Sequence, residues 1–412
     1  MLTAWKEWID RTGRRFPWYR RLLDEQVGRS GGGTAAGLSQ ERLPLLTASL
    51  LEAHYYTEAN PLAQRADHRR YRTSGTSTGR RKTIYYSERD EEAYLRIKRE
   101  VFRAILGPID YRTAVSDLGT GHAEATAAEV FRGLGMTAHT LPFRLPIEGH
   151  IEALARIRPE VLYTMPSILD RILQTAEDPA AFGIRQVILV GETASRAWCS
   201  RVAERLDIAP ERIADTYGSI EIGTIAYYAH EHGRYLFADG IVAEGIGVEE
   251  LGEAYEPLAG ESERVLVLSS TAREAFPALR YVTYDVVRDL RPILAGGELR
   301  MSFRNVARRI GPELKHGEKI SIYDIEDAVY RHLREAAVRV RVLGRCLRVC
   351  LQSPAPIGEE NLSRIRRQIE DAVPEIGQMI RGGLLAGIEV VQEATDDTLD
   401  GDIVKRKKIF YA

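Results

Sequence analysis

The most informative segment of the chain runs Tyr71-Arg72-Thr73-Ser74-Gly75-Thr76-Ser77-Thr78-Gly79-Arg80-Arg81-Lys82. It combines five serine and threonine hydroxyls, two glycines and a closing basic cluster. Glycine lets the backbone approach a ligand closely, and successive backbone N–H groups form a concave anion site. A terminal lysine adds a compact positive charge. The segment therefore predicts a phosphate-binding loop, although loops of this composition also occur as plain surface turns.

The spacing of this loop differs from that of a Walker P-loop. That motif has Gly, four residues, and then Gly-Lys-Ser/Thr at the start of a helix. Here three residues separate Gly75 from Gly79, and two arginines stand between Gly79 and Lys82. The residues that follow, 83–87, predict a short strand. A P-loop hydrolase is therefore disfavoured.

The composition is that of an ordinary globular protein. With 412 residues the chain can bury a large core and form two or more domains. Its formal net charge of -2 creates no field that would attract nucleic acid or an anionic membrane, so we expect neither partner. The basic, aromatic N-terminus lacks the apolar core of a signal peptide and predicts an amphipathic helix.

The three cysteines, Cys199, Cys346 and Cys350, predict neither a zinc site nor a disulfide framework. Cys346 and Cys350 lie four residues apart in a predicted strand, so they share one face, and we expect two buried thiols. This cysteine usage fits a reducing compartment, and no transmembrane run is present. We therefore expect a cytoplasmic protein.

Residues 113–219 alternate between short apolar runs and helical stretches. This alternation predicts an α/β fold with a mostly parallel sheet flanked by helices. Ligands of such sheets bind beyond the carboxyl ends of the strands, so the turns there are candidates for the site. The predicted strands are Thr113–Leu118, Met136–Leu141, Val161–Thr164, Gln186–Val190 and Arg212–Thr216, and the predicted helices cover 122–134, 148–157, 166–176 and 195–206.

The sequence pattern changes after residue 220. Residues 224–303 are rich in β-forming residues and turns, which predicts a β-rich subdomain. The last hundred residues predict a small α+β unit, with helices over 320–333 and 361–373, a hairpin over 338–351 and a strand over 384–391. We therefore predict a large N-terminal core domain, residues 1–305, and a small, mobile C-terminal lid domain, residues 306–412.

Three later segments add chemistry to the loop. Asp215-Thr216-Tyr217-Gly218-Ser219-Ile220-Glu221 closes a predicted strand with an aromatic ring, a hydroxyl and a carboxylate, which suit a base, a phosphate and a divalent cation. Arg280-Tyr281-Val282-Thr283-Tyr284-Asp285 places a carboxylate beside a strand, where it suits a ribose diol, and Lys405-Arg406-Lys407-Lys408 lies near the C-terminus. Each segment alone also fits ordinary core or surface residues, so the inference depends on their order and spacing.

The order of these segments resembles the adenylate-forming superfamily of acyl-CoA synthetases, adenylation domains and luciferases, and in particular its compact phenylacetate–CoA ligase branch. Thr73–Lys82 is similar to the family's Ser/Thr/Gly phosphate loop. Residues 215–221 match Asp-x-Tyr-Gly-x-x-Glu, residues 280–285 resemble Arg-Tyr-x-Thr-Gly-Asp, and Gly191-Glu192 matches the Gly-Glu pair between them. The resemblance covers nearly the whole chain.

The resemblance implies a two-step reaction that uses ATP and Mg²⁺. A carboxylate attacks the α-phosphate to give an acyl-adenylate and pyrophosphate, and a thiol then displaces AMP to give a thioester. The first step needs charge stabilisation around a phosphoryl group and little covalent chemistry from the protein. The residues that the resemblance assigns to ATP or AMP are Thr73, Ser74, Gly75, Thr76, Ser77, Thr78, Gly79, Lys82, Gly191, Glu192, Thr193, Asp215, Thr216, Tyr217, Gly218, Ser219, Asp285 and Arg308.

Individual roles also follow from the resemblance. The loop steadies the leaving pyrophosphate, Tyr217 packs on adenine and Ser219 contacts the α-phosphate. Asp285 holds the ribose hydroxyls, and Glu221 is the metal ligand. Lys405 is the catalytic lysine that bridges the carboxylate and phosphate oxygens as a compact cation.

The chain departs from the family pattern at three places: the C-terminal lysines, the signature at residues 280–285 and the hinge near Arg308. The family's Lys-x-x-Arg becomes Lys405-x-x-Lys408 without its preceding glycine, so Lys407 and Lys408 stay open as the catalytic lysine. Tyr284 stands where the family usually has Gly. The Gly-Arg-x-Asp hinge lacks its carboxylate, and only Arg308 remains there as the ribose-contacting arginine.

The resemblance also implies an acyl pocket, which we expect to be lined by His122, Glu124, Thr164, Met165, Pro166 and Gly223. His122 can bond a hydroxyl on an aromatic acid, or it can be a helix-start histidine satisfied by backbone. By analogy with the branch we expect an aromatic carboxylic acid and transfer to CoA. Loading of a phosphopantetheinyl carrier protein is the alternative acceptor, and a non-catalytic nucleotide-binding protein is the alternative of another class.

Overall fold

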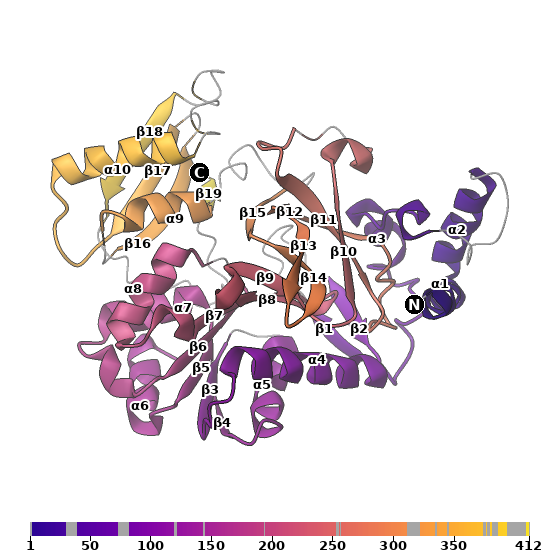
Figure 1. Ribbon diagram of the computed structural model, residues 1–412, viewed down its shortest axis with the longest axis horizontal. Coiled ribbons are helices and arrows are strands. Elements are labelled where there is room, and N and C mark those ends of the chain that lie inside the picture. The colour runs from indigo at the N-terminus through magenta and orange to yellow at the C-terminus, as the bar shows by residue number, and fades with distance from the viewer. Residues whose placement is uncertain are drawn as a thin grey trace. The chain divides into compact units, whose positions relative to one another are not determined.

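The computed structural model describes residues 2–29, 39–72, 82–118, 122–142, 145–192, 194–252, 255, 257–310, 322–333, 336–343, 346–373, 376, 380, 386–393 and 409–411 (Figure 1). The chain forms two compact units. Unit 1 comprises Met1–Phe102, Gly218–Tyr227 and Arg234–Asn305, and unit 2 comprises Arg103–Tyr217, Tyr228–Gly233 and Val306–Ala412. The domain boundary near residue 306 stays a prediction.

Unit 2 is built on a parallel sheet in the order β7-β6-β5-β3-β4. Its strands are β3 (Thr113–Asp117), β4 (Thr137–Leu141), β5 (Val161–Thr164), β6 (Gln186–Val190) and β7 (Ile213–Ser219). Its helices are α5 (His122–Arg132), α6 (Ile147–Ile157), α7 (Pro166–Thr175) and α8 (Arg196–Leu206). The predicted alternation of strands and helices is confirmed, with bounds that agree within three residues.

The direction of the chain across this sheet reverses once. Helix α5 leads from β3 outward to β4, whereas α6, α7 and α8 lead back through β5 and β6 to β7, so α5 and the other three helices cover opposite faces (Figure 1). Val115, Leu162 and Leu189 are buried against α6, α7 and α8. On the other face Phe131 of α5 packs edge-on against Tyr163, with 6.2 Å between ring centroids. The reversal makes the carboxyl ends of β3 and β5 a switch point, where ligands of such sheets bind.

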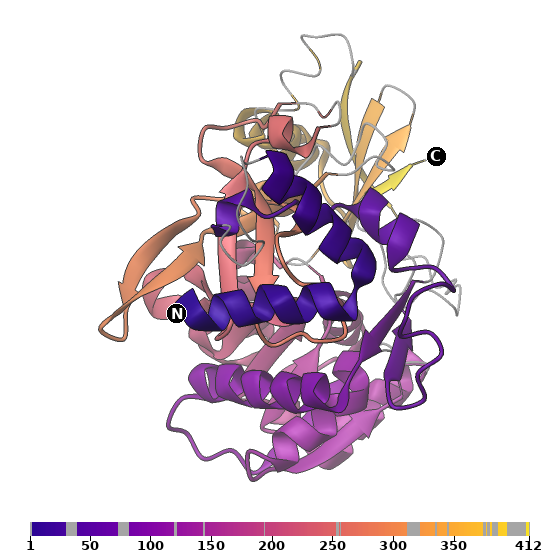
Figure 2. The same cartoon turned by 90° about the vertical axis from the view of Figure 1, so that its right-hand side faces the viewer.

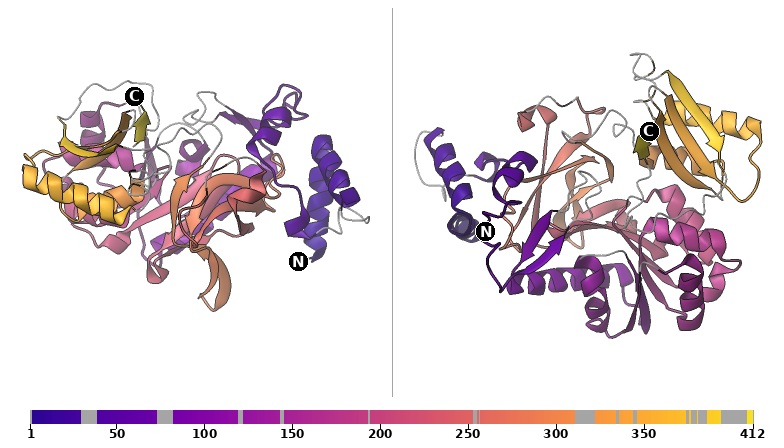
Figure 3. Two further views of the ribbon diagram at one scale, coloured as in Figure 1. Left: turned by 90° about the horizontal axis from the view of Figure 1, so that it is seen from above. Right: turned by 180° about the vertical axis from the view of Figure 1, so that it is seen from behind.

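The described residues after 321 form a small α+β module, as predicted, and this module belongs to unit 2. Its sheet has the order β18-β17-β16-β19, and both helices cover one face of it (Figure 3). Val329 and Val349 belong to the same buried cluster as Trp198 of α8, and the Ala197 N–H donates to the Asp327 carboxylate at 3.3 Å. The elements are α9 (Ile322–Tyr330), β16 (Ala337–Leu343), β17 (Cys346–Gln352), α10 (Glu359–Ala372), β18 (Gly387–Gln392) and β19 (Ile409–Tyr411).

The two thiols of β17 differ in burial. Cys350 is buried, as expected, but Cys346 is only half-buried because it lies at the start of the strand. Desolvation raises the pKa of Cys350 to about 11. In the part of the chain that the structure describes, no group of three or more His, Cys, Asp or Glu is placed to hold a metal. No described helix is long and apolar enough to cross a membrane.

Unit 1 is mostly antiparallel, which confirms the predicted β-rich region. Strands β10 (Ile241–Ile246), β11 (Glu263–Ser270) and β12 (Tyr281–Arg288) pair in that order, and the register between β11 and β12 shifts at a bulge. A hairpin of β13 (Arg291–Ala295) and β14 (Glu298–Phe303) pairs with β9 (Arg234–Phe237), and β1 (Arg69–Arg72) pairs with β2 (Thr83–Tyr86). Strands β8 (Gly223–Ala229) and β15 (Asn305–Arg309) begin in unit 1 and end in unit 2, whereas β7 begins in unit 2 and ends in unit 1.

The N-terminal helix is in fact two helices that meet at a sharp angle (Figure 2). Pro17 opens the second helix at a position where proline is tolerated, and Phe16 at the bend is fully buried. The ring of Phe16 lies 6.1 Å from Trp18 and 6.0 Å from Tyr55, so the bend is anchored in an aromatic core. The helices of unit 1 are α1 (Leu2–Arg15), α2 (Pro17–Arg29), α3 (Ala48–His54) and α4 (Glu88–Leu106), which continues into unit 2 from Arg103.

Candidate active site

In unit 2 one carboxylate joins the turns that follow β5 and β6. Glu192 accepts hydrogen bonds from both the backbone N–H and the hydroxyl of Ser167, each at 2.8 Å. Ser167 lies in the first turn of α7, which is capped by Met165 and opened by Pro166. A carboxylate is favourable at this positive end of a helix. Gly191, with a φ of 87°, supplies the left-handed backbone that turns Glu192 toward α7.

The predicted acyl-pocket residues of unit 2 lie at the switch point. His122 is the buried first residue of α5, and its carbonyl accepts from the Thr126 hydroxyl at 2.7 Å. Glu124 is half-buried in the same turn, and Thr164 ends β5 fully buried. Because β3 precedes α5 and pairs with β5, His122 and Thr164 reach the same edge of the sheet.

The first part of the signature at residues 215–221 lies on β7, beside β6. Asp215 and Thr216 are buried, and the Thr216 hydroxyl donates to the Leu189 carbonyl at 2.6 Å. Tyr217 is half-buried, and an aromatic side chain is suited to stacking on a base. Arg308 is also half-buried, on β15. The structure thus places Tyr217 two residues before the end of β7.

The second part of the signature lies in unit 1 and consists of the last two residues of β7, Gly218 and Ser219, and the tight turn 220–222 that leads into β8 at Gly223. A Cβ on Gly218 would lie 2.7 Å from the Gly223 carbonyl oxygen, so only glycine fits at this position. The Ser219 hydroxyl accepts from the Ile222 N–H at 3.2 Å and closes the turn. This close approach of two backbone segments explains why the motif needs its glycine.

Two buried side chains hold the backbone around Glu221. The Tyr86 hydroxyl donates to the Ile220 carbonyl, and the Arg273 guanidinium donates to the Glu221 carbonyl, both at 2.8 Å. Arg273 also lies over the Tyr86 ring, 3.7 Å from its centroid. The turn therefore presents the Glu221 side chain from a fixed backbone.

Lys82, at the end of the phosphate loop, and Glu221 both interact electrostatically with Tyr56. The Lys82 ammonium lies 4.9 Å from the centroid of the Tyr56 ring and pairs with Glu52 at 2.5 Å. Burial raises the pKa of Tyr56 well above its usual value, and the charge of Glu221 raises it further. Tyr56 carried no sequence signal, because it lies in an otherwise ordinary leucine-rich segment.

The surroundings of Glu221 suit Mg²⁺ held together with a nucleotide. Mg²⁺ in nucleotide sites is commonly bound by one or two carboxylates and completed by phosphates and water. The half-buried Glu221 supplies such a carboxylate, and Lys82 from the phosphate loop is close enough to share a neighbour with it. The donor set therefore fits an ion that arrives with ATP.

Asp285 lies at the bulge of β12. Its backbone N–H donates to the Thr283 hydroxyl at 3.1 Å, which in turn donates to the Leu266 carbonyl at 2.8 Å. Tyr284 has a φ of 61°, the left-handed conformation that glycine adopts most easily, and this explains why the resembling family usually has Gly here. The Tyr284 hydroxyl accepts from the Ala48 N–H at 3.0 Å and so caps α3.

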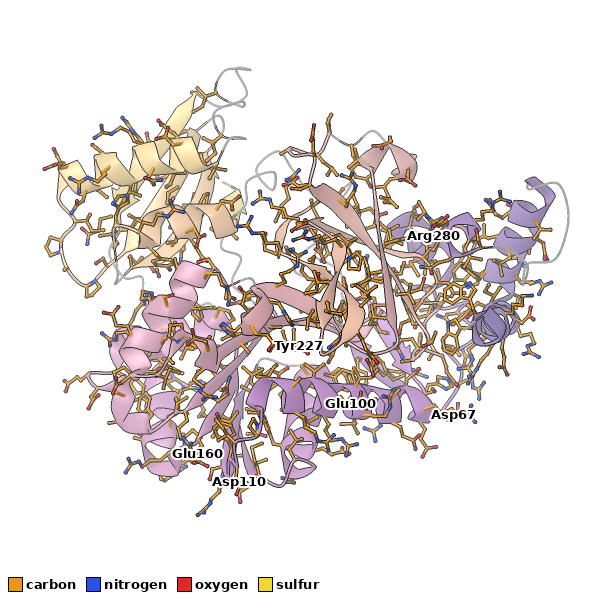
Figure 4. The ribbon with its side chains drawn as sticks, viewed as in Figure 1. Asp67, Glu100, Asp110, Glu160, Tyr227 and Arg280 are labelled. Atoms are coloured by element: carbon orange, nitrogen blue, oxygen red, sulfur yellow. The ribbon has the colours of Figure 1, made fainter. Side chains whose placement is uncertain are left out.

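Arg280, labelled in Figure 4, begins the second signature but binds the protein itself. Its guanidinium donates to the carbonyls of Glu41 and Leu43 at 2.8 and 2.7 Å and pairs with Glu244 at 2.5 Å. These contacts anchor the segment before α3 next to the start of β12. The arginine of this signature therefore has a structural role.

Some predicted site residues lie outside the described residues: Thr73, Ser74, Gly75, Thr76, Ser77, Thr78, Gly79, Thr193 and Lys405. For the others the structure gives positions, and their roles stay predictions.

Comparison with known proteins agrees with this geometry. A family model described as the fumarate–diaminopropanoate ligase C-terminal domain matches residues 315–396. The fumarate–(S)-2,3-diaminopropanoate ligase of Enterobacter agglomerans is 36% identical over 405 residues, which cover 97% of this chain and 97% of that protein. The chain belongs to the adenylate-forming ligases, in their phenylacetate–CoA ligase-like branch. It is thus an ATP-dependent, AMP-forming ligase that adenylates a carboxylic acid.

Other relatives of this ligase support the same branch and fold. The phenylacetate–coenzyme A ligase of Thermus thermophilus is 26% identical over 294 residues, which cover 66% of this chain and 61% of that protein. The structure of a 2-hydroxyisobutyryl-CoA ligase in its postadenylation state covers 100% of this chain and 88% of its own, with a TM-score of 0.77 and 13% identity. The open conformation of the same enzyme gives a TM-score of 0.63 at 14% identity, covering 99% and 90%.

The ligase also contains a buried pair at the end of β3 that sequence reasoning missed. His150 Nδ1 lies 2.9 Å from an Asp117 carboxylate oxygen, and His150 Nε2 lies 3.1 Å from the Leu145 carbonyl. Burial lowers the pKa of His150, but the bond to Asp117 outweighs it and the net shift is upward. The only signal was a carboxylate at the end of an apolar strand, and 33 residues separate the partners.

Proposed function

We propose that this ligase activates a short dicarboxylic acid of the fumarate type with ATP and transfers the acyl group to an amine of a diamino acid, forming an amide. The observation that carries the proposal is the 36% identity to the fumarate–(S)-2,3-diaminopropanoate ligase over 97% of both chains. A likeness that spans both units and the C-terminal module includes every element around the candidate site. The family model over residues 315–396 points the same way.

In the first step the acid carboxylate attacks the α-phosphorus of ATP, and pyrophosphate leaves. Tyr217 stacks on adenine, Asp285 holds the ribose, and Ser219 contacts the α-phosphate. Lys405 supplies the cation that brings the carboxylate and phosphate oxygens together, and the 73–82 loop steadies the pyrophosphate. When bound at Glu221, Mg²⁺ would neutralise charge on the phosphates.

In the second step the amine nitrogen attacks the acyl carbon of the adenylate. The C–N bond forms, the bond from carbon to the AMP oxygen breaks, and the nitrogen loses one proton. The neutral amine is the nucleophile, so the step needs no thiol. The same fixed groups around the α-phosphate hold AMP as it leaves.

A second candidate is the thioester activity expected from the sequence, in which an aromatic acid is joined to CoA or to a carrier protein. The 26% identity to the phenylacetate–coenzyme A ligase supports it, although that match covers only 66% of this chain. The two candidates share the adenylation step and differ in the acid and in the acceptor.

The test is ATP–pyrophosphate exchange with fumarate, phenylacetate and benzoate, followed by mass spectrometry of products made with 2,3-diaminopropanoate or CoA. We expect exchange with fumarate and a product whose mass equals the acid plus the amine minus water, together with AMP. Exchange with aromatic acids alone and a CoA thioester as the product would overturn the amide proposal in favour of the second candidate.

A further inference from the structure

Helix α4 carries a lysine on its buried face. Tyr94, Ile97, Val101 and Phe102 recur at helical spacing and are buried, as expected for the core-facing stripe of an amphipathic helix. Lys98 lies within this stripe and is only 2% exposed. Lysine is rarely so deeply buried, and buried charges with perturbed surroundings cluster at functional sites, so Lys98 is a candidate for such a site.

The contacts of Lys98 are those of a charge held in an aromatic surrounding. Its ammonium donates to the Tyr94 hydroxyl at 2.9 Å. It also lies 5.1 Å from the ring centroid of Tyr94 and 5.7 Å from that of Phe102. Burial lowers the pKa of Lys98 to about 7, because desolvation disfavours the charged form. An anionic ligand would reverse this penalty by stabilising the ammonium.

Tyr94 connects this lysine to the turn of the candidate site within unit 1. A Cβ on Gly223, a predicted pocket residue, would lie 3.0 Å from the edge of the Tyr94 ring. Tyr94 also stands edge-on to Tyr86, at 6.4 Å between centroids, and Tyr86 holds the Ile220 carbonyl of the same turn. Lys98 is therefore separated from the signature turn by a single side chain.

We propose that Lys98, oriented by Tyr94, binds the second carboxylate of a short dicarboxylic acid and so selects this class of acid. The inference rests on the proposed function, because it concerns the acid that is adenylated. One carboxylate of the acid reacts at the α-phosphate, while the other forms a charge-assisted hydrogen bond with the Lys98 ammonium. An uncharged end in the same place would leave a buried ammonium facing an apolar group, which is unfavourable.

The test compares fumarate with crotonate, which has the same length but a methyl group in place of the second carboxylate. Pyrophosphate exchange is measured for the wild-type protein and for Lys98→Met, which keeps the length of the side chain and removes its charge. We expect the kcat/KM for fumarate to fall about 10- to 100-fold in Lys98→Met, in line with a lost charged hydrogen bond. The kcat/KM for crotonate should stay the same or rise, and Lys98→Arg should retain part of the preference for fumarate.

The matched control is Arg96→Met on the exposed face of the same helix, where Arg96 pairs with Glu100, labelled in Figure 4, at 3.1 Å. This variant should keep the wild-type ratio of fumarate to crotonate activity. An equal loss for both acids in a folded Lys98→Met would overturn the inference and leave the proposed function standing. A wild-type protein that activates no dicarboxylic acid would instead overturn the proposed function, and the inference with it.

Discussion

Two buried cations contact the same helix of unit 1 and differ in almost every other respect. Arg273 pairs with Asp90, at the start of α4, at 2.7 Å and donates to the carbonyls of Tyr85 and Glu221 at 3.0 and 2.8 Å. Burial alone would lower its pKa, but Asp90 outweighs that effect and the net shift is upward. Lys98, two turns along the helix, contacts the Tyr94 hydroxyl, and burial lowers its pKa to about 7.

The difference distinguishes a cation that stabilises the fold from one that can bind an anionic ligand. Arg273 has a carboxylate of its own and a fork of donors that fixes the signature turn, so its charge is already used by the fold. The charge of Lys98 is held at a cost, because burial disfavours the ammonium and lowers its pKa. Groups with strongly perturbed pKa values beside a predicted pocket are typical of binding sites.

The largest effect is expected from Arg273→Met. The variant leaves Asp90, which is 1% exposed, as a buried carboxylate without its cation. Breaking a buried pair from one side costs about 3–5 kcal/mol, so chemical denaturation should show a loss of this size. Arg89→Met, at an exposed position one residue before Asp90, is the control and should change the free energy of unfolding by less than about 0.5 kcal/mol. A loss as small as that of the control would mean that Arg273 is not structural.

The substitution Lys98→Met should raise the free energy of unfolding of the ligand-free protein, in contrast to Arg273→Met. The pKa of Lys98 is about 7 when folded and 10.5 in an unfolded chain, so between these values the unfolded state binds more protons. Its contribution therefore destabilises most below about pH 7 and fades as the pH approaches 10.5. Removing it should stabilise the protein by about 2–4 kcal/mol at pH 7 and by much less at pH 10. A stability difference that does not change with pH would contradict this assignment.

The smallest effect is expected from Tyr94→Phe. This variant keeps the ring that packs on Gly223 and removes the hydroxyl that accepts from Lys98. The loss of one hydrogen bond from a charged donor should destabilise the protein by about 1–2 kcal/mol. Stabilisation in place of destabilisation would show that the hydroxyl does not hold the ammonium. The measurement is the same denaturation series, run at the pH values used for Lys98→Met.

The α/β core could be predicted because its pattern is local. Each apolar run of 113–219 is a strand of four to seven residues, and each intervening segment has the period of a helix. The C-terminal module was predictable for the same reason. The two N-terminal helices were expected as one, because a proline at the first position of a helix leaves the helical pattern continuous across the bend.

The signature turn could also be located, since Gly218 and Glu221 stand in a recognisable order. The groups that support this turn could not, because they come from distant parts of the chain. Arg273 is 52 residues from Glu221, and Tyr86 is 134 residues from Ile220. Lys98 was missed for a different reason: a single lysine in a helical stretch is ordinarily exposed, and only packing shows that this one is buried.

Tyr284 shows how a substitution can become hard to reverse. A residue other than glycine with a φ of 61° carries a backbone strain of about 1–2 kcal/mol. Here the same side chain caps α3 through the Ala48 N–H, and it is buried in the sheet. A return to glycine would remove the strain but also the cap and the packed ring. An exchange between tyrosine and glycine at this position therefore changes the stabilising contacts of the protein in either direction. In evolutionary terms, a lineage that adopts the tyrosine would be held there by the contacts it has gained.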